Sequence, residues 1–339
     1  MTAAATSFSR PRARRRFLSQ THIPLLATTL VYLLLYGAAS WKYDGFFSWG
    51  VFVNLLQDNA VLGLAAIGMT FVIQSGGIDL SVGAVVGCTS IVGAELITKA
   101  GWSPQAAISA VLTGGALFGA AQGGIVHFFR LPPFLVTLAG MFLARGVGLV
   151  ISLESVQIEH PFYMKIADFS FQNLPGTELR ILPMTALIFL GVLLAGIYIA
   201  RWTRFGRNVY AIGGSEPSAV LMGLPVGRTK VLVYALSGFC AALAGVVYTF
   251  YTLSGSAAEA GKLLELDAIA AAVIGGTLLS GGVGTVFGTL LGVLIYGTIN
   301  TAIIFDGRLN SWWTRIGVGA LLLAFVLLQR MVESRASRR

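Results

Sequence analysis

Long runs of apolar residues, separated by short polar segments, extend along almost the whole chain. A helix needs about 20 largely apolar residues to cross a bilayer. Runs of about this length lie at residues 22–40, 51–74, 78–98, 104–128, 132–153, 181–200, 229–253, 265–282, 284–305 and 313–330. The pattern therefore predicts an all-α polytopic membrane protein with about ten transmembrane helices, some of them short or broken.

Two of these runs need a closer reading. The first follows Arg14, Arg15 and Arg16 and has the outline of a signal peptide. Its apolar part is longer than the usual core of about 7–15 residues, so we expect a membrane anchor that is retained. The eighth and ninth runs are separated by little more than Gly281 and Gly282. This glycine pair alone sets the boundary between them.

The composition agrees with a location in the bilayer. Hydrophobic residues make up 56% of the 339 residues and charged residues only 11%, whereas soluble domains carry about 25% charged residues. The chain also has 42 glycines, which allow close helix packing in membranes. Cys88 and Cys240 both lie in apolar runs, so we expect buried thiols and no disulfide framework. A soluble enzyme and a disordered chain are both excluded.

The basic residues indicate how the chain is oriented. The net charge is +9, but the Lys and Arg residues form short clusters between apolar runs, so no nucleic-acid partner is expected. With ten spans and the N-terminus inside, fifteen of them lie in cytoplasmic segments and seven in outer ones, as the positive-inside rule requires. Both termini are therefore predicted to be cytoplasmic, with a basic tail at 1–21, a membrane domain at 22–330 and a second tail at 331–339.

Two loops of this arrangement are longer than the others. Residues 154–180 form a predicted periplasmic loop, large enough to cap the outer mouth of the membrane domain. Residues 201–228 form the longest inner loop, with basic residues at both ends and small residues in the centre. This inner loop is either a docking surface for a cytoplasmic partner or a solvated linker.

A glycine-rich break separates the second and third runs. In Ser75–Ser81, Gly76 and Gly77 release the backbone from helical geometry, and Asp79 or Ser81 can cap the next helix. One interpretation is a tight cytoplasmic turn. The other is a break that shapes a path through the membrane, since irregular backbone at membrane depth is tolerated only inside protein or along a cavity.

A second break of the same kind lies between the eighth and ninth runs. Ser280 to Gly284 follows the pair Gly275 and Gly276 and precedes further glycines at four-residue spacing, Gly288 and Gly292. That spacing places Gly284, Gly288 and Gly292 on one helix face, which favours close helix packing. The likeness of the two Ser-Gly-Gly segments hints at an internal repeat, a common feature of transporter folds.

Polar residues inside apolar runs are candidates for function because they are costly in a bilayer. They are Asp58, Asn59, Glu95, Gln122, Arg145, Asp267 and Asn300. Arg145 lies nearest the middle of a run and needs a partner or a wet cavity. From these residues and the glycine breaks we select candidates for a substrate path: Asn59, Gly76, Gly77, Asp79, Gly275, Gly276 and Asn300.

The sequence contains no recognisable catalytic or nucleotide-binding motif. Gly261-Lys262 is followed by Leu263, whereas a phosphate loop needs a hydroxyl residue there and a glycine-rich stretch before it. His22, His127 and His160 are too scattered along the chain to suggest a metal site. We therefore expect no catalytic residue, no metal ligand and no cofactor.

Three segments resemble a known family. Residues 76–83, 204–214 and 267–277 resemble signature segments of sugar-type ABC importer permeases, the ribose/xylose/galactofuranose group. In addition, residues 73–82, 209–214, 265–285 and 305–314 are similar to a permease of a galactofuranose importer. The matching segments are spread over roughly residues 50–330, in the family's order.

The resemblance implies a permease of the bacterial inner membrane that has no enzyme activity and binds no ATP. Its implied partners are membrane lipid, a cytoplasmic ABC ATPase, a periplasmic sugar-binding protein and a second permease, with a heterodimer favoured and a homodimer possible. Residues 213–223 match the family's ATPase-coupling segment, so the implied coupling residues are Gly213, Gly214, Ser215, Glu216, Pro217, Ser218, Ala219 and Gly223. Ser215 to Ser218 can start a short helix that Gly223 and Pro225 end.

Two alternatives to galactofuranose import remain at this point. The first keeps the same role and changes the cargo to ribose or to another pentose or hexose. The second is an ion-coupled secondary transporter, which would need essential carboxylates within the membrane and no ATPase docking.

Overall fold

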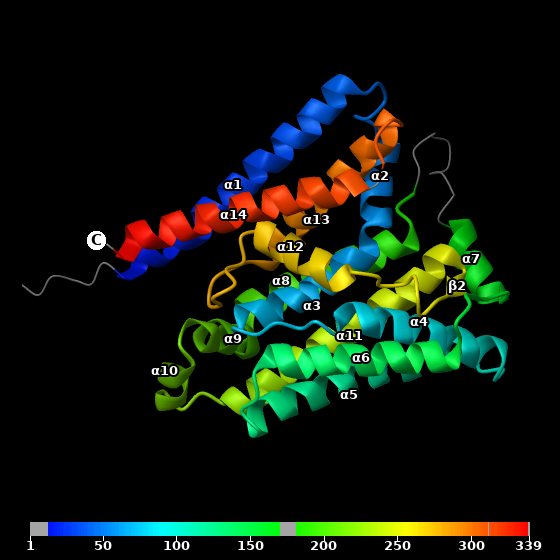
Figure 1. The fold of residues 1–339 in the computed structure, drawn as a ribbon, viewed down its shortest axis with the longest axis horizontal. Helices are drawn as coiled ribbons and strands as arrows, with labels where there is room; N and C mark the ends of the chain where they lie inside the picture. Colours follow the sequence, from blue (N-terminus) through cyan, green and yellow to red (C-terminus); the bar gives the residue numbers. More distant parts are fainter. Residues whose placement is uncertain (1–12, 170–180, 311, 338–339) are drawn as a thin grey trace, which may run out of the picture.

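The computed structural model describes residues 13–169, 181–310 and 312–337 (Figure 1). The described residues form helices joined by short loops, with two very short strands. The elements are α1 (Ala13–Lys42), α2 (Trp49–Asp58), α3 (Ala60–Gln74), α4 (Val82–Thr98), α5 (Pro104–Phe128), α6 (Pro133–Ile151), β1 (Val156–Gln157), α7 (Pro161–Phe169), α8 (Met184–Trp202), α9 (Arg204–Gly214), α10 (Glu216–Leu221), α11 (Val226–Thr252), β2 (Ser254–Gly255), α12 (Leu264–Ile274), α13 (Val286–Asp306) and α14 (Trp312–Ser337).

The predicted all-α membrane architecture is confirmed. Within the described residues, seven helices are long and apolar enough to cross a bilayer, namely α1, α5, α6, α8, α11, α13 and α14. An eighth span arises if α2 and α3, which meet at a bend of 55°, are taken as one. The third and eighth predicted runs form the shorter helices α4 and α12, of 17 and 11 residues. The number of ten spans stays a prediction.

The centre of the molecule is built from α3 and α11. Almost every residue of α3 is buried, as is the inner face of α11. The pair α5 and α11 packs backbone to backbone, because Gly115 and Gly119 of α5 lie against Gly238 and the Tyr234 carbonyl of α11. Only residues without a Cβ allow such an approach, and small residues at helix interfaces are a feature of membrane proteins.

The packing interpretation of the glycines in α13 is confirmed at two of the three positions. Gly288 lies against the backbone of Gly275, and Gly292 lies against that of Ala271, so α12 and α13 approach closely. Gly284 lies before the helix, with φ +149°, against Thr277. The glycine spacing is therefore a device for packing α12 on α13.

The molecule has two ends that are useful as landmarks. The beginning of α1, the end of α14 and, below them, α10 all lie at the left of Figure 1, and we name this side the α10 end. The opposite end, named the α7 end, holds α7 and the pairing of β1 with β2, in which Val156 lies opposite Gly255. Of the predicted outer loop at 154–180, residues 170–180 lie outside the described residues.

Candidate functional site

The predicted coupling segment folds as a short capped helix. Ser215 ends α9 and begins α10, where its side-chain oxygen accepts the amide proton of Ser218. Pro217 occupies the second position of α10, where its missing amide proton costs nothing. Gly223 follows with φ +74°, a left-handed conformation that suits glycine at the end of a helix. The sequence prediction for this helix is confirmed.

Helix α10 turns a patch of large apolar side chains outward. Ala219 is buried against α9 and α11, together with Ile212 and Val226. The next three side chains, Val220, Leu221 and Met222, are 58%, 89% and 66% exposed. We name these three the α10 tip. Contiguous exposed apolar side chains are typical of surfaces that contact another protein or a membrane.

An ion pair fixes α10 to α11. The ammonium group of Lys230 donates to both carboxylate oxygens of Glu216, each at 2.7 Å. The Lys230 side chain is 17% exposed and that of Glu216 is 47% exposed. The pair links the start of α10 to the first turns of α11. Helix α10 is therefore joined to α9 through Ser215 and to α11 through this ion pair.

Both Ser-Gly-Gly breaks meet at Gly213 and Gly214, the last two residues of α9, which lie shortly before α10. The Gly282 amide donates to the Gln74 carbonyl at 2.9 Å, which joins the second break to the end of α3. Gly213 lies against this same bond, because a Cβ on Gly213 would collide with both bonded groups. Gly76 and Gly281 lie against each other beside the carbonyl of Gly213. We name this contact of three segments the glycine junction.

Asp79 lies in a closed network of hydroxyl groups at the start of α4. It is 2% exposed and accepts hydrogen bonds from the backbone amide and hydroxyl of Ser81 and from the Ser237 hydroxyl of α11. Gln122 of α5 bonds to Ser81. The structure therefore places Asp79 between α4, α5 and α11, where it holds the break in shape. Gly77 lies against the Tyr234 hydroxyl in the same region.

The other predicted path residues lie in several separate places. Asn59 occupies the bend between α2 and α3, where it is 7% exposed and donates to the Leu55 carbonyl at 2.8 Å. Gly275 ends α12 against α13, and Gly276 lies against Pro24 of α1. All three are buried in helix contacts. The structure does not bring them together with Asp79 into one open site.

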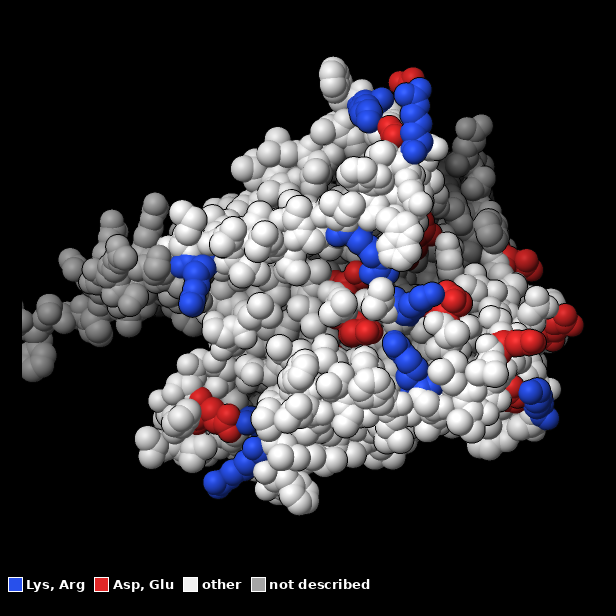
Figure 2. Space-filling view, in the orientation of Figure 1, with Lys and Arg blue, Asp and Glu red and all other residues white. Residues whose placement is uncertain are grey.

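In the middle of the face shown in Figure 2, charged side chains gather over α12, between α14 and α6, while the other charged side chains on this face lie nearer its edges. Helix α12 supplies Glu265 and Asp267. Half-buried Arg145 of α6 lies within electrostatic reach of Glu265, and Arg315 of α14 lies 4.0 Å from Asp267. Arg145 thus has the charged neighbour that its position in the sequence required.

Two residues of this region escaped the sequence analysis. Arg315 is one of the seven Lys and Arg residues assigned to outer segments, where nothing distinguishes it, and Tyr296 lies within an apolar run. In the structure the Tyr296 hydroxyl donates to Asp267 at 3.1 Å. One helical turn further along α13, Asn300 accepts from the Thr314 hydroxyl at 3.2 Å. Asn300, a predicted path residue, therefore lies one turn along α13 from the contact of Tyr296 with Asp267.

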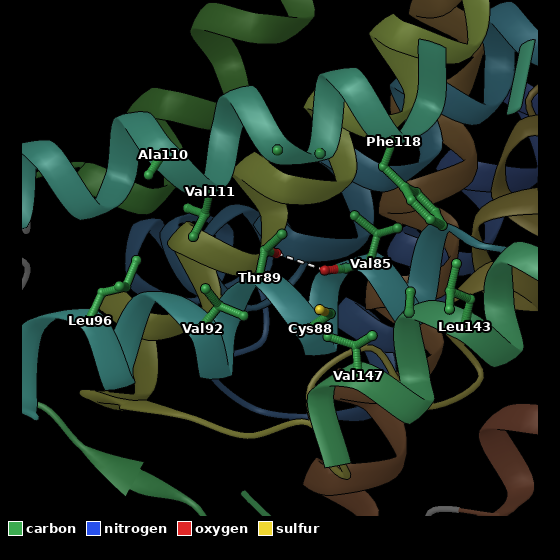
Figure 3. Close-up of a pocket in the computed structure, with 13 residues that line it drawn as sticks. Val85, Cys88, Thr89, Val92, Leu96, Ala110, Val111, Phe118, Leu143 and Val147 are labelled. Carbon is green, nitrogen blue, oxygen red and sulfur yellow. Dashed lines mark hydrogen bonds between the residues drawn. The ribbon is translucent and has the colours of Figure 1, made fainter. Parts of the chain in front are cut away.

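A cavity of about 340 Å³ lies between α4, α5 and α6 (Figure 3). Its walls are apolar, with Val92, Leu143 and Val147 pointing into it. The Thr89 hydroxyl in its wall is already bonded to the Val85 carbonyl at 2.7 Å. The cavity offers nothing to bind the hydroxyl groups of a polar solute, so it is not a candidate for such a site.

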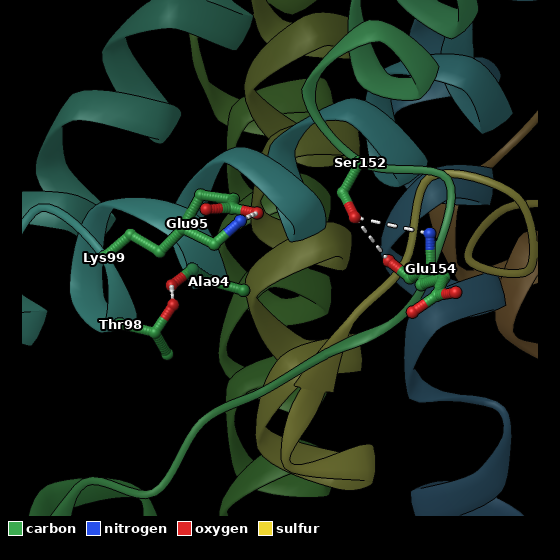
Figure 4. A network of polar contacts seen from close by, with 6 residues as sticks. All are labelled: Ala94, Glu95, Thr98, Lys99, Ser152 and Glu154. Atoms are coloured by element: carbon green, nitrogen blue, oxygen red, sulfur yellow. Dashed lines mark hydrogen bonds and ion pairs between the residues drawn. The ribbon is translucent and has the colours of Figure 1, made fainter.

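Local polar contacts stabilise the C-terminal end of α4. Lys99 pairs with Glu95 at 2.7 Å, and Thr98 bonds back to the Ala94 carbonyl (Figure 4). Beside them the Ser152 hydroxyl shapes the turn to Glu154 after α6. The Lys99 side chain is 70% exposed. Glu95, one of the polar residues within a predicted run, is therefore part of a surface ion pair.

Comparison with known proteins identifies the family. Residues 51–326 match the family model described as the permease component of branched-chain amino acid transport systems. The chain belongs to this permease family. It is a multi-pass permease of the inner membrane, a transport component without a catalytic role.

Three relatives cover most of the permease. It is 48% identical over 309 residues to the inner membrane ABC transporter permease protein YjfF of Escherichia coli, covering 91% of this chain and 92% of that protein. It is 37% identical to the fructose import permease protein FruG of Bifidobacterium longum, over 98% of this chain and 97% of the relative. It is 39% identical to the ribose import permease protein RbsC of Bacillus subtilis, over 82% and 84%. No solved structure matches the chain significantly.

Proposed function

We propose that this permease carries a monosaccharide inward across the inner membrane in an ATP-driven importer. The relatives named as fructose and ribose import permeases align over most of the chain and support a sugar as cargo. The resemblance of residues 305–314 to a galactofuranose permease selects galactofuranose as the first candidate. Ribose, or another pentose or hexose, is the alternative.

The observation that carries the proposal is the position of α10. Its exposed tip is a contact surface for a cytoplasmic ABC ATPase, and the residues just before it belong to the glycine junction. In this proposal the α10 end faces the cytoplasm, with the tails at 1–21 and 331–339. ATP is bound and hydrolysed on the partner subunit.

The glycine junction can transmit a movement of the ATPase to the path through the membrane domain. A displacement of α10 moves Gly213, and Gly213 touches both the end of α3 and the loop before α13. The two breaks then shift together, which changes the relative free energies of an inward-open and an outward-open path. The permease makes and breaks no covalent bond with the sugar.

Two further partners complete the importer. A periplasmic sugar-binding protein delivers the sugar at the α7 end. A second permease subunit covers the charged face over α12, because charged side chains in a membrane segment face protein or water. A heterodimer is the favoured arrangement, with a homodimer as the alternative.

Uptake by proteoliposomes that contain the complete importer tests this proposal. Leu221→Ser, on the α10 tip, is expected to lower both ATPase co-purification and sugar uptake at least tenfold, a loss of about 1.4 kcal/mol in binding. Leu153→Ser is the matched control for ATPase co-purification, because Leu153 is 77% exposed in a loop at the α7 end, away from α10. Sugar accumulation that continues without the ATPase, driven by an ion gradient, would overturn the proposal.

A further inference from the structure

Charged and aromatic side chains lie together where α14 begins. The guanidinium group of Arg315 lies 5.8 Å from the centre of the Trp312 ring and 4.0 Å from the Asp267 carboxylate. Helix α13, with 21 residues, leads away from the glycine junction for about 30 Å before the chain reaches this point. The Trp312 end of the group therefore lies on the side away from α10, whereas Asp267 meets Tyr296 at the middle of α13.

The exposure of these side chains is unfavourable in lipid. Trp312 is 64% exposed, and the side chains of Arg315 and Asp267 are 38% and 15% exposed. Ionisable side chains in membrane segments almost always face a protein interior or a water-filled cavity. The Thr314 side chain, which is 3% exposed, bonds to Asn300 beneath this surface. This part of the face therefore needs protein or water against it, and a water-filled path bordered by the second permease subunit meets that need.

The arrangement matches the chemistry of a sugar. Asp267 is held by the Tyr296 hydroxyl at 3.1 Å and by Arg315, yet an ionised carboxylate has about four acceptor positions and keeps room for sugar hydroxyls. The guanidinium group of Arg315 has five N–H donors, and its 4.0 Å contact with Asp267 leaves most of them available for sugar oxygens. The exposed Trp312 ring supplies an apolar wall, and ligand sites combine such walls with a few oriented polar groups.

We propose that Asp267, Arg315 and Trp312 form a contact site for a monosaccharide in the outer half of the path. The site rests on the proposed sugar-import function and specifies where the chain touches its cargo. The carboxylate accepts hydrogen bonds from sugar hydroxyls, the guanidinium group donates hydrogen bonds to sugar oxygens, and the indole packs against the C–H face of the ring. Because Tyr296 orients the carboxylate beforehand, little conformational freedom is lost on binding.

Cysteine labelling of the complete importer in membrane vesicles tests the site. In a Cys88→Ala, Cys240→Ala background, Trp312→Cys is treated from the outside with a membrane-impermeant maleimide, with and without D-galactose, D-ribose, D-xylose or D-fructose and the binding protein. We expect labelling that at least one sugar slows threefold or more. Trp41→Cys is the control, since Trp41 is 92% exposed on α1 and lies outside the site; no sugar should slow its labelling.

Transport kinetics provide the second readout. Asp267→Asn and Arg315→Gln should each raise KM for uptake at least tenfold, whereas the maximal ATPase rate changes less than twofold. Asp306→Asn breaks a different ion pair, with Lys42 at 3.1 Å, and should leave KM unchanged. If Asp267→Asn is not recovered in the membrane, Trp312→Leu replaces it with the same expected rise in KM.

The outcomes separate this site from the function on which it rests. Labelling that no sugar slows, absence of labelling from outside, or unchanged KM in the variants would overturn the site while ATP-driven uptake by the wild type continues. Trp312 would then be a membrane-interface anchor, as tryptophans often are. Failure of wild-type uptake to depend on the ATPase would instead overturn the proposed function.

Discussion

The backbone amide of Gly282 donates a hydrogen bond of 2.9 Å to the carbonyl oxygen of Gln74. Gln74 is the last residue of α3, and the last carbonyls of a helix have no partner within it. The loop between α12 and α13 supplies that partner, and Gly213 lies against the bond. The end of α9 and the two broken segments are thus joined at one point directly before α10.

The glycine junction should tolerate no side chain at Gly213. Gly213→Ala places a Cβ against the Gln74 carbonyl and the Gly282 amide, so we expect a loss of about 1–3 kcal/mol in stability and a strong loss of uptake. Gly214→Ala is the matched control, because a Cβ there meets nothing within 4 Å. Thermal unfolding in detergent and vesicle uptake measure both effects. Equal behaviour of the two variants would show that the junction is not tightly packed.

The ion pair of Glu216 and Lys230 should affect coupling more than stability. Glu216→Lys places two like charges at the contact between α10 and α11, so we expect uptake to fall while stability changes by less than about 1 kcal/mol. The double variant Glu216→Lys, Lys230→Glu restores the attraction and should recover most of the uptake. No recovery in the double variant would mean that Glu216 acts through another partner.

Removing the Asp79 carboxylate should destabilise the start of α4. Asp79→Ala leaves the amide and hydroxyl of Ser81 and the hydroxyl of Ser237 without their acceptor in a buried place, so we expect a loss above about 2 kcal/mol. Ser237→Ala removes one of these bonds and should cost about 1 kcal/mol. Thermal unfolding measures both. A neutral Asp79→Ala variant would contradict the structural role.

The contact of α12 with α13 should depend on Gly292. A methyl group there would meet the backbone of Ala271, so Gly292→Ala should push the helices apart and cost about 1–3 kcal/mol. Gly319→Ala on α14 is the control, since a Cβ at Gly319 meets nothing within 4 Å. Thermal unfolding of the two variants compares them directly. The prediction is wrong if Gly292→Ala unfolds at the temperature of the control.

The sequence by itself determined the features that local chemistry controls. Apolar runs specify membrane helices because every backbone polar group must be bonded within the segment. Ser215, Pro217 and Gly223 specify the limits of α10 because caps act over a few residues. The four-residue spacing of Gly288 and Gly292 specified a packing face because residues four apart lie on the same side of a helix. The family also followed from short segments of the chain.

Only the tertiary structure decided which distant residues meet. A glycine has no side chain that indicates what it contacts, so the contact of Gly213 with both breaks could not be predicted from the sequence. Asp79 was compatible with a tight cytoplasmic turn and with a break that shapes a path, and its contact with Ser237 of α11 could not be predicted from the sequence. Arg315 was assigned only to an outer segment until α14 placed it next to Asp267. Burial and charge pairing depend on how helices pack, and packing joins residues that lie far apart in sequence.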